Sequence, residues 1–315
     1  MRPGAAALAF VLTSACAADT ALDAGRDAPR NDAPRDAGRP IDPARFDCSG
    51  PADPVRVSPV PFGCPVDAAC VMRMMSAHRG AGAPGVLAPE NSLAATRAAI
   101  VLGADLVEMD VRFTADGVAV LMHDADVDRT TDGTGPVEGY TLDALSALAL
   151  DAGELPGDFS CERVPTLADE LALTAGRIVA VLDLSKTDRL EEIVDEVLAA
   201  GALDRVVFDH PDLAALDRVI AHAPEAHVLL RATDPDALGA GLDHLAAHPP
   251  VYVHVEDADP AALLPSARGQ RLFALGFTRD LLAPRDLTAY ESAYAAGATM
   301  LQTNRPDLLG AFLGR

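Results

Sequence analysis

The chain has 315 residues, of which 50% are hydrophobic, and its 47 acidic and 25 basic side chains give a formal net charge of −22. The apolar fraction is sufficient for a buried core and excludes a wholly disordered chain. The acidic excess argues against a nucleic-acid-binding protein, which needs clustered lysine and arginine. Among the basic residues the sole lysine is Lys186, which makes its position in the fold of interest.

Residues 1–17 are predicted to be an export signal. Arg2 precedes an apolar run, residues 5–11, that is far shorter than the roughly 20 residues of a membrane-spanning helix. Two cleavage sites fit. Residues 12–16 resemble a bacterial lipobox, which would make Cys16 a lipidated first residue. Residues 15–17 suit ordinary signal peptidase, which would release a soluble protein. We favour a lipoprotein, exported to the periplasm or the cell surface.

Residues 18–46 repeat Ala, Asp, Arg and Pro and hold almost no large apolar side chain. Such a segment cannot bury enough surface to offset the entropy lost on ordering, so we predict a disordered linker. The folded domain is then expected to span residues 47–315.

Four cysteines follow the export signal: Cys48, Cys64, Cys70 and Cys161. An exported chain meets an oxidising compartment, so this even number predicts up to two disulfides. Three pairings are possible, and the sequence does not choose among them. We favour a local Cys64–Cys70 loop, which leaves Cys48–Cys161 to tie the N-terminal segment to the rest of the domain. A zinc site is disfavoured because the ligand spacing is wrong.

From residue 70 onward, strand and helix patterns alternate. The predicted strands are residues 72–77, 105–110, 178–183, 206–209, 228–231, 251–255, 272–276 and 299–302. The predicted helices between them include residues 92–102, 190–200, 211–221, 235–246 and 306–313. About eight strand–helix units over roughly 240 residues predict a (β/α)8 TIM barrel rather than an open sheet.

One connection in this pattern is too short to cross between parallel strands, which takes a dozen or more residues. The pair Asp116-Gly117 instead predicts a β-hairpin after the second strand. Pairing of Thr114 with Val118 would place His123 opposite Met109. We expect this register to put the imidazole between Glu108 and Asp110, which share one face of their strand.

The reactive groups of such a barrel lie at the C-terminal ends of its strands. The polar residues expected there are His78, Arg79, Glu90, Asn91, Glu108, Asp110, His123, Asp183 and Lys186. The carboxylates of Glu108, Asp110 and Asp183 can supply hard oxygen ligands for Ca²⁺ or Mg²⁺. The cation, a guanidinium and an ammonium can offset the charge of a phosphodiester, and two histidines can transfer protons. The set predicts metal-assisted phosphate-ester chemistry.

These residues fall within short motifs that are dense over residues 75–145. The motifs are Ala77-His78-Arg79-Gly80, Pro89-Glu90-Asn91-Ser92, the segment from Gly103 to Val111, Thr114-Ala115-Asp116-Gly117, Val120-Leu121-Met122-His123-Asp124 and Asp128-Arg129-Thr130-Thr131. In order and spacing they resemble the glycerophosphodiester phosphodiesterase family. The resemblance implies a metal-dependent barrel that hydrolyses glycerophosphodiesters, a small-molecule substrate class, to glycerol 3-phosphate and an alcohol.

The resemblance also implies a role for each matching residue. It implies that His78 and His123 form the acid–base pair. Arg79 would clamp the phosphate, and Lys186 would assist at the same group. Metal ligands would be Glu108 and Asp110, with Asp183 as the third and Glu90 as a further candidate. Asn91 would support the site and contact substrate.

Three departures from the family pattern leave alternatives open. The family usually has Glu-x-Lys on its fourth strand, whereas here two residues separate Asp183 from Lys186. Asn304 stands where a late motif usually has Asp, and the chain has no tryptophan. A lipid-directed phosphodiesterase resembling the sphingomyelinase D branch, which Asp183 favours, is one alternative. A non-catalytic surface-binding barrel is the other.

Overall fold

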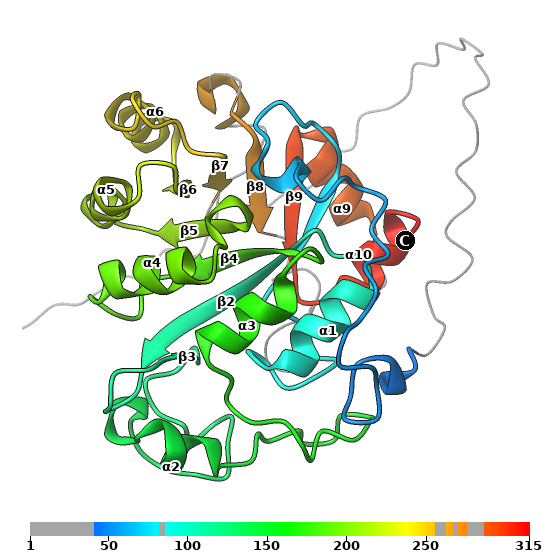
Figure 1. Cartoon of the computed structure of the whole chain (residues 1–315). Coiled ribbons are helices and arrows are strands. Elements are labelled where there is room, and N and C mark those ends of the chain that lie inside the picture. The colour runs from blue at the N-terminus through cyan, green and yellow to red at the C-terminus, as the bar shows by residue number, and fades with distance from the viewer. Residues whose placement is uncertain (1–40, 82–85, 256–262, 268–269, 276–286) are drawn as a thin grey trace, which may run out of the picture. The chain divides into compact units, whose positions relative to one another are not determined.

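The structure, a computed structural model, describes residues 41–81, 86–255, 263–267, 270–275 and 287–315 (Figure 1). Its centre is a closed ring of parallel strands. In order around the ring these are β1 (Met74–Ala77), β2 (Leu106–Phe113), β4 (Val179–Asp183), β5 (Val206–His210), β6 (His227–Ala232), β7 (Tyr252–Val255), β8 (Leu272–Leu275) and β9 (Ala298–Thr303). Because β9 pairs with β1, the sheet has no open edge. The predicted (β/α)8 barrel is confirmed.

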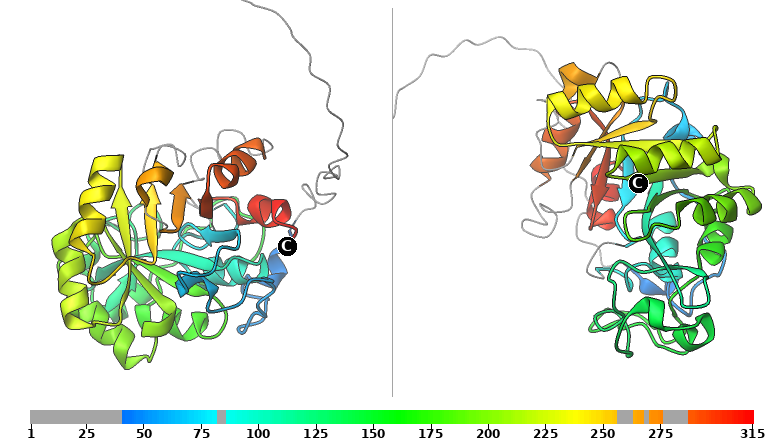
Figure 2. Two further views of the ribbon diagram at one scale, coloured as in Figure 1. Left: turned by 90° about the horizontal axis from the view of Figure 1, so that it is seen from above. Right: turned by 90° about the vertical axis from the view of Figure 1, so that its left-hand side faces the viewer.

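Helices cover the outside of the ring. They are α1 (Leu93–Val101), α3 (Leu167–Thr174), α4 (Leu190–Ala199), α5 (Leu213–His222), α6 (Pro235–His244), α9 (Thr288–Ala295) and α10 (Pro306–Phe312). The short helix α2 (Leu142–Ser146) instead lies in the segment after the β2–β3 hairpin and packs in a separate apolar cluster. Single 3-10 turns occur at Pro43–Arg45, Cys64–Val66, Val137–Gly139, Leu203–Arg205 and Leu264–Ala267. Figure 2 shows α4, α5 and α6 as a green-to-yellow layer outside the strands. Several helices begin at a side-chain cap; the Ser92 hydroxyl, for example, accepts the Ala95 N–H at 3.1 Å.

Because side chains point alternately outward and inward along each strand, the barrel has two apolar clusters, one outside and one inside the ring of strands. Residues such as Met75, Val107 and Leu182 point outward and pack under the helices. Their neighbours, among them Leu106 and Val181, point inward and fill the N-terminal half of the barrel. The inward positions at the C-terminal ends of the strands are polar, and these positions hold the site described below.

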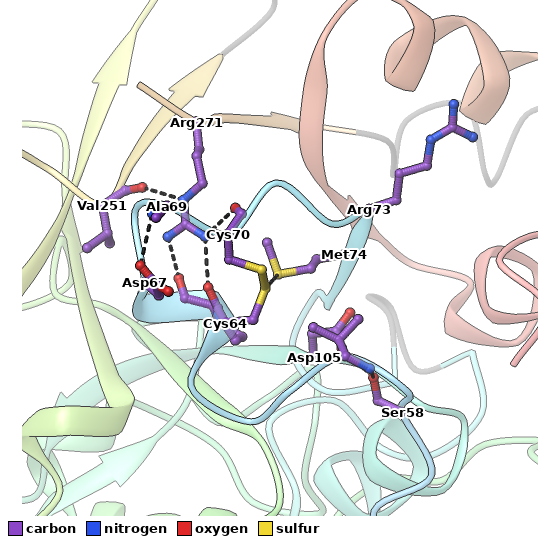
Figure 3. The surroundings of a disulfide bond; sticks show 12 residues. Ser58, Cys64, Asp67, Ala69, Cys70, Arg73, Met74, Asp105, Val251 and Arg271 are labelled. Carbon is purple, nitrogen blue, oxygen red and sulfur yellow. Dashed lines mark hydrogen bonds between the residues drawn. A yellow bond between two sulfur atoms is a disulfide. The ribbon is translucent and has the colours of Figure 1, made fainter. Parts of the chain in front are cut away.

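A disulfide-closed loop covers the N-terminal end of the barrel (Figure 3). Cys64 and Cys70 are bonded, and Cys64 packs in the interior cluster against Met74. The buried guanidinium of Arg271 donates to the Cys64 carbonyl at 2.8 Å and lies 4.1 Å above the Tyr252 ring. These contacts fix the loop to two strands of the barrel.

The second disulfide joins Cys48 to Cys161, so the pairing that the sequence analysis favoured is confirmed. Residues 41–46 were expected in the linker, but Phe46 is 1% exposed and stacks on Phe159. Hydrogen bonds from Arg45 to the Val101 carbonyl at 2.9 Å and from Arg97 to the Phe46 carbonyl at 3.0 Å add to this contact. The predicted export signal, residues 1–17, and residues 18–40 lie outside the described residues.

The predicted hairpin is also confirmed. β3 (Ala119–Leu121) runs antiparallel to β2, with Phe113 opposite Ala119 and Val111 opposite Leu121. The Thr114 N–H donates to the Val118 carbonyl at 3.0 Å, as the expected register requires. In the part of the chain that the structure describes, no helix is both long and apolar enough to cross a membrane.

One carboxyl group is buried in the helical layer, away from the barrel mouth. Glu170 of α3 is fully shielded from solvent, and its two oxygens accept the Thr96 hydroxyl at 2.8 and 3.0 Å. Burial raises the pKa of Glu170 to about 8. Between its unfolded pKa, near 4.5, and pH 8, the folded chain therefore holds a proton that the unfolded chain has lost.

The folded state should consequently lose stability as pH rises from about 4.5 to 8, by up to about 1.4 kcal/mol per pH unit. Glu170→Gln mimics the protonated form, so we expect it to raise the melting temperature at pH 8 and to change it little at pH 4.5. Thermal unfolding followed by circular dichroism checks this, with Glu154→Gln at the surface as the control. An equal effect of Glu170→Gln at both pH values would contradict the account.

Candidate active site

Three carboxylates meet at the C-terminal end of the barrel. Glu108 and Asp110 lie on β2 and Asp183 ends β4; all are buried, and one ligand oxygen from each lies within 4.8 Å of the others. The strand register explains the meeting. Asp110 is directly opposite Asp183, and Glu108, two residues away, faces the same side of β2. We call these residues the carboxylate triad.

Burial, mutual repulsion and neighbouring cations act differently on Glu108 and Asp183 of the carboxylate triad. Burial, followed by the charges of Asp110 and Asp183, raises the pKa of Glu108 well above its usual range. Burial would also raise the pKa of Asp183, but Arg231 and Lys186 outweigh it and lower that pKa to about 2. The Lys186 ammonium lies 3.2 Å from Asp183 and 3.7 Å from Asp110. The chain's lysine therefore lies at the barrel mouth, as predicted.

His78 follows β1 beside the carboxylate triad. Its Nδ1 lies 2.8 Å from the amide oxygen of Asn304, and its Nε2 lies 3.8 Å from Glu108. An amide oxygen can only accept, so Nδ1 carries the proton of the neutral ring and Nε2 is left as the basic nitrogen. Burial, and then the charge of Arg79, lowers the pKa of His78 to about 4. Asn304, a departure from the family pattern, thus orients this ring.

Two residues near the site adopt left-handed backbone conformations that are costly for a side chain: Arg79 at φ 48° and Asn91 at φ 52°. The Arg79 N–H donates to Glu108 at 3.1 Å. Both ends of the Asn91 amide are bonded to Asp110, through its carboxylate at 3.0 Å and its backbone N–H at 3.2 Å. The Asn91 amide therefore holds Asp110, and the expected contact of Asn91 with substrate stays a prediction.

Glu90 does not join the carboxylate triad, although it was predicted as a further metal ligand. Its oxygens accept from Arg79 at 2.9 Å and from Arg129 at 2.7 and 2.9 Å. Burial alone would raise the pKa of Glu90, but Arg129 and Arg79 lower it below its usual range. Two guanidinium groups therefore occupy the carboxylate in this structure, and its role as a further metal ligand stays a prediction.

His123 follows β3, where the hairpin register continues as far as the Met122 N–H, which donates to the Asp110 carbonyl at 3.0 Å. The ladder ends there, before His123, so the expected position of its ring between Glu108 and Asp110 stays a prediction. The His123 ring is 34% exposed, and its Nδ1 lies 2.7 Å from Asp124.

The sequence analysis assigned no role to three residues that contact this region. Arg129 joins Glu90 to Asp124. Arg231 of β6 lies 3.3 Å from Asp183 and donates to Asp209 of β5 at 2.8 and 3.0 Å. Asp209 and Arg231 are inward-facing polar residues near the ends of their strands, so the same strand-end rule would have found them.

Comparison with known proteins decides the family. A sequence model of the glycerophosphoryl diester phosphodiesterase family matches residues 78–268. The chain belongs to this family. It is 36% identical over 185 residues to glycerophosphodiester phosphodiesterase 1 of Bos taurus, a match that covers 58% of this chain and 52% of that protein. The chain therefore spans about half the length of this curated relative.

Two further family members extend the comparison. A glycerophosphodiester phosphodiesterase of Caldanaerobacter subterraneus subsp. tengcongensis is 45% identical over 101 residues, which cover 32% of this chain and 40% of that protein. The crystal structure of a glycerophosphodiester phosphodiesterase from Agrobacterium tumefaciens superposes with a TM-score of 0.64 at 27% identity. The superposition covers 76% of this chain and 100% of the Agrobacterium tumefaciens chain. Family members generally depend on a divalent metal, and the carboxylate triad is a candidate site for one.

Proposed function

We propose that this chain hydrolyses glycerophosphodiesters to glycerol 3-phosphate and an alcohol. The observation that carries the proposal is the buried carboxylate triad with His78, Arg79 and Lys186 around it at the mouth of the barrel. Membership of the family supports the reaction class. Acids, bases and cations gathered at one barrel mouth suit attack on an anionic phosphodiester.

The donor set fits a hard divalent cation. Burying three carboxylates costs free energy unless neighbouring positive charge fully offsets theirs. Carboxylate oxygens are also the ligands that Ca²⁺ and Mg²⁺ prefer. We assign Glu108, Asp110 and Asp183 as the residues that would hold the ion. When bound, it would offset negative charge on the phosphate oxygens.

The chain's own residues provide the remaining chemistry in this proposal. His78 is neutral near pH 7 because its pKa is about 4, so Nε2 can accept a proton from the attacking hydroxyl. To protonate the leaving alkoxide through Nε2, His123 would have to act as the imidazolium, with its Nδ1–H held by the Asp124 carboxylate. Arg79 and Lys186 would bind the phosphate. Arg79 would donate two hydrogen bonds from its planar guanidinium, and Lys186 would contribute a compact positive charge.

The acid–base assignment predicts that His78→Ala and His123→Ala each lower kcat by about 10²–10⁴-fold. Release of glycerol 3-phosphate measures the loss, and circular dichroism verifies the fold. His222→Ala is the matched control, because His222 also pairs with an aspartate at 2.7 Å but lies on α5 at the surface. Activity within tenfold of the wild type in either site variant would refute the assignment.

The metal assignment predicts that chelation abolishes turnover and that Ca²⁺ or Mg²⁺ restores it. Asp183→Asn removes one charge of the triad, so we expect it to raise the metal concentration that gives half-maximal activity by at least about tenfold. Asp217→Asn, on the surface of α5, serves as the control. Full turnover in the chelated wild type would exclude a metal-dependent reaction.

The same assays test the alternative substrate class. An enzyme of the sphingomyelinase D type would release choline or ceramide phosphate from intact lipid, whereas our proposal expects glycerol 3-phosphate from the deacylated diester. Tight ligand binding without turnover would instead favour the non-catalytic barrel.

The proposal includes export and an N-terminal lipid anchor at Cys16, supported by the signal-like sequence of residues 1–17. Pairing of all four later cysteines agrees with an oxidising compartment. Labelled palmitate should enter the wild-type chain in a bacterial host but not the Cys16→Ala variant. Equal labelling of both chains would contradict the anchor.

A further inference from the structure

Arg129 connects two loops at the edge of the barrel mouth. Its Nη1 and Nη2 donate to the two oxygens of Glu90 at 2.9 and 2.7 Å, a bidentate fork. Its Nε donates to Asp124 Oδ2 at 2.6 Å. One guanidinium thus binds a carboxylate from the loop before α1 and another from the loop after β3.

The other oxygen of Asp124 meets His123. Oδ1 lies 2.7 Å from the ring Nδ1. An ionised carboxylate can only accept a hydrogen bond, so the neutral ring in this contact carries its proton on Nδ1. The lone pair then lies on Nε2, the nitrogen that must give and take protons if His123 works as an acid or base.

Glu90 is the fixed end of this chain of contacts. It is buried and also accepts from Arg79 at 2.9 Å, and the Arg79 backbone N–H is bonded to Glu108 of the carboxylate triad. Asp124, in contrast, is 30% exposed, and His123 is 34% exposed. Without a partner on its far oxygen, Asp124 could rotate into water. Arg129 supplies that partner.

We propose that Arg129 is a positioning residue: by holding Asp124 against Glu90 it sets the tautomer and orientation of the His123 ring. This inference rests on the proposed function, because it explains how His123 is prepared for proton transfer. Arg129 acts through Asp124 rather than on the substrate.

The competing explanation is that Arg129 only links two loops through its ion pairs and has no effect on His123; we call this stapling. The Arg129 side chain is 42% exposed, but its partner Glu90 is buried, so loss of this ion pair would destabilise the fold. Stapling therefore predicts a lower melting temperature with no change in the ring of His123. Positioning predicts a change in that ring even when the fold is retained.

The test uses Arg129→Met in the full chain. The ring nitrogens of His123 are observed by ¹⁵N NMR of histidine-labelled protein at a pH where the ring is neutral, with His123→Ala to assign the signal. We expect the wild type to show the Nδ1–H tautomer and Arg129→Met to lose more than half of it. Asp124→Ala, which removes the acceptor itself, should shift the ring to the Nε2–H form.

Kinetics give a second readout on the same variants. We expect Arg129→Met to lower kcat by about 10–100-fold while KM stays within about threefold, the pattern of a group that orients another. Arg129→Lys keeps the positive charge but not the bidentate hydrogen bond to Glu90, so its kcat should lie between those of Arg129→Met and the wild type. Arg218→Met is the matched control, since Arg218 forms the same kind of fork with Glu191 between α4 and α5. It should behave as the wild type.

Any of three results would overturn the proposal. The first two are an Nε2–H tautomer in the wild type and a wild-type tautomer in Arg129→Met. The third is a kcat within threefold of the wild type in Arg129→Met. If Arg129→Met does not fold, Arg129→Lys decides in its place by the same two readouts. An inactive wild type would contradict the proposed function, yet the ring measurement would still decide whether Arg129 positions His123.

Discussion

The mutual repulsion of three buried carboxylates is the constraint around which the barrel mouth is organised. Taking ionised groups out of water costs several kcal/mol each, and placing like charges within 4.8 Å of one another adds to that cost. The surrounding residues offset part of it. Lys186 and Arg231 contact Asp183, and Arg79 lies 3.4 Å from Asp110. A divalent cation would supply the remaining positive charge, which is why the site and the proposed reaction belong together.

The rest of the fold keeps this arrangement rigid. Parallel pairing of β2 with β4 fixes Asp110 opposite Asp183, and the apolar half of the barrel below them is closed by the Cys64–Cys70 loop. The strained backbones of Arg79 and Asn91 lie where their side chains and N–H groups hold the carboxylates in place. Strain of this kind persists when surrounding contacts determine the local conformation, and it concentrates at functional sites.

Much of this could be predicted from the sequence, because strands and carboxylates follow simple rules. Side chains alternate along a strand, which predicts that Glu108 and Asp110 share one face. The Asp116-Gly117 turn predicts the hairpin register, and the end of a predicted strand predicts the place of Asp183. The sequence could not predict the direction in which side chains of the loops point. The ring of His123 is held by its chain neighbour Asp124, and Glu90 pairs with Arg79, 11 residues away, and with Arg129, 39 residues away. No local periodicity encodes such contacts between loop side chains. Arg129 was visible within a motif, but its role follows only from the fork that it makes with Glu90.

The central claim is that the carboxylate triad exists to hold a cation. Calorimetric titration of the metal-stripped chain with Ca²⁺ and with Mg²⁺ tests it most directly, by comparing the wild type with the triple variant Glu108→Gln, Asp110→Asn, Asp183→Asn. The account predicts one strong site per wild-type chain and none in the triple variant. Equal binding by both chains, or no binding by a folded wild type, would contradict it.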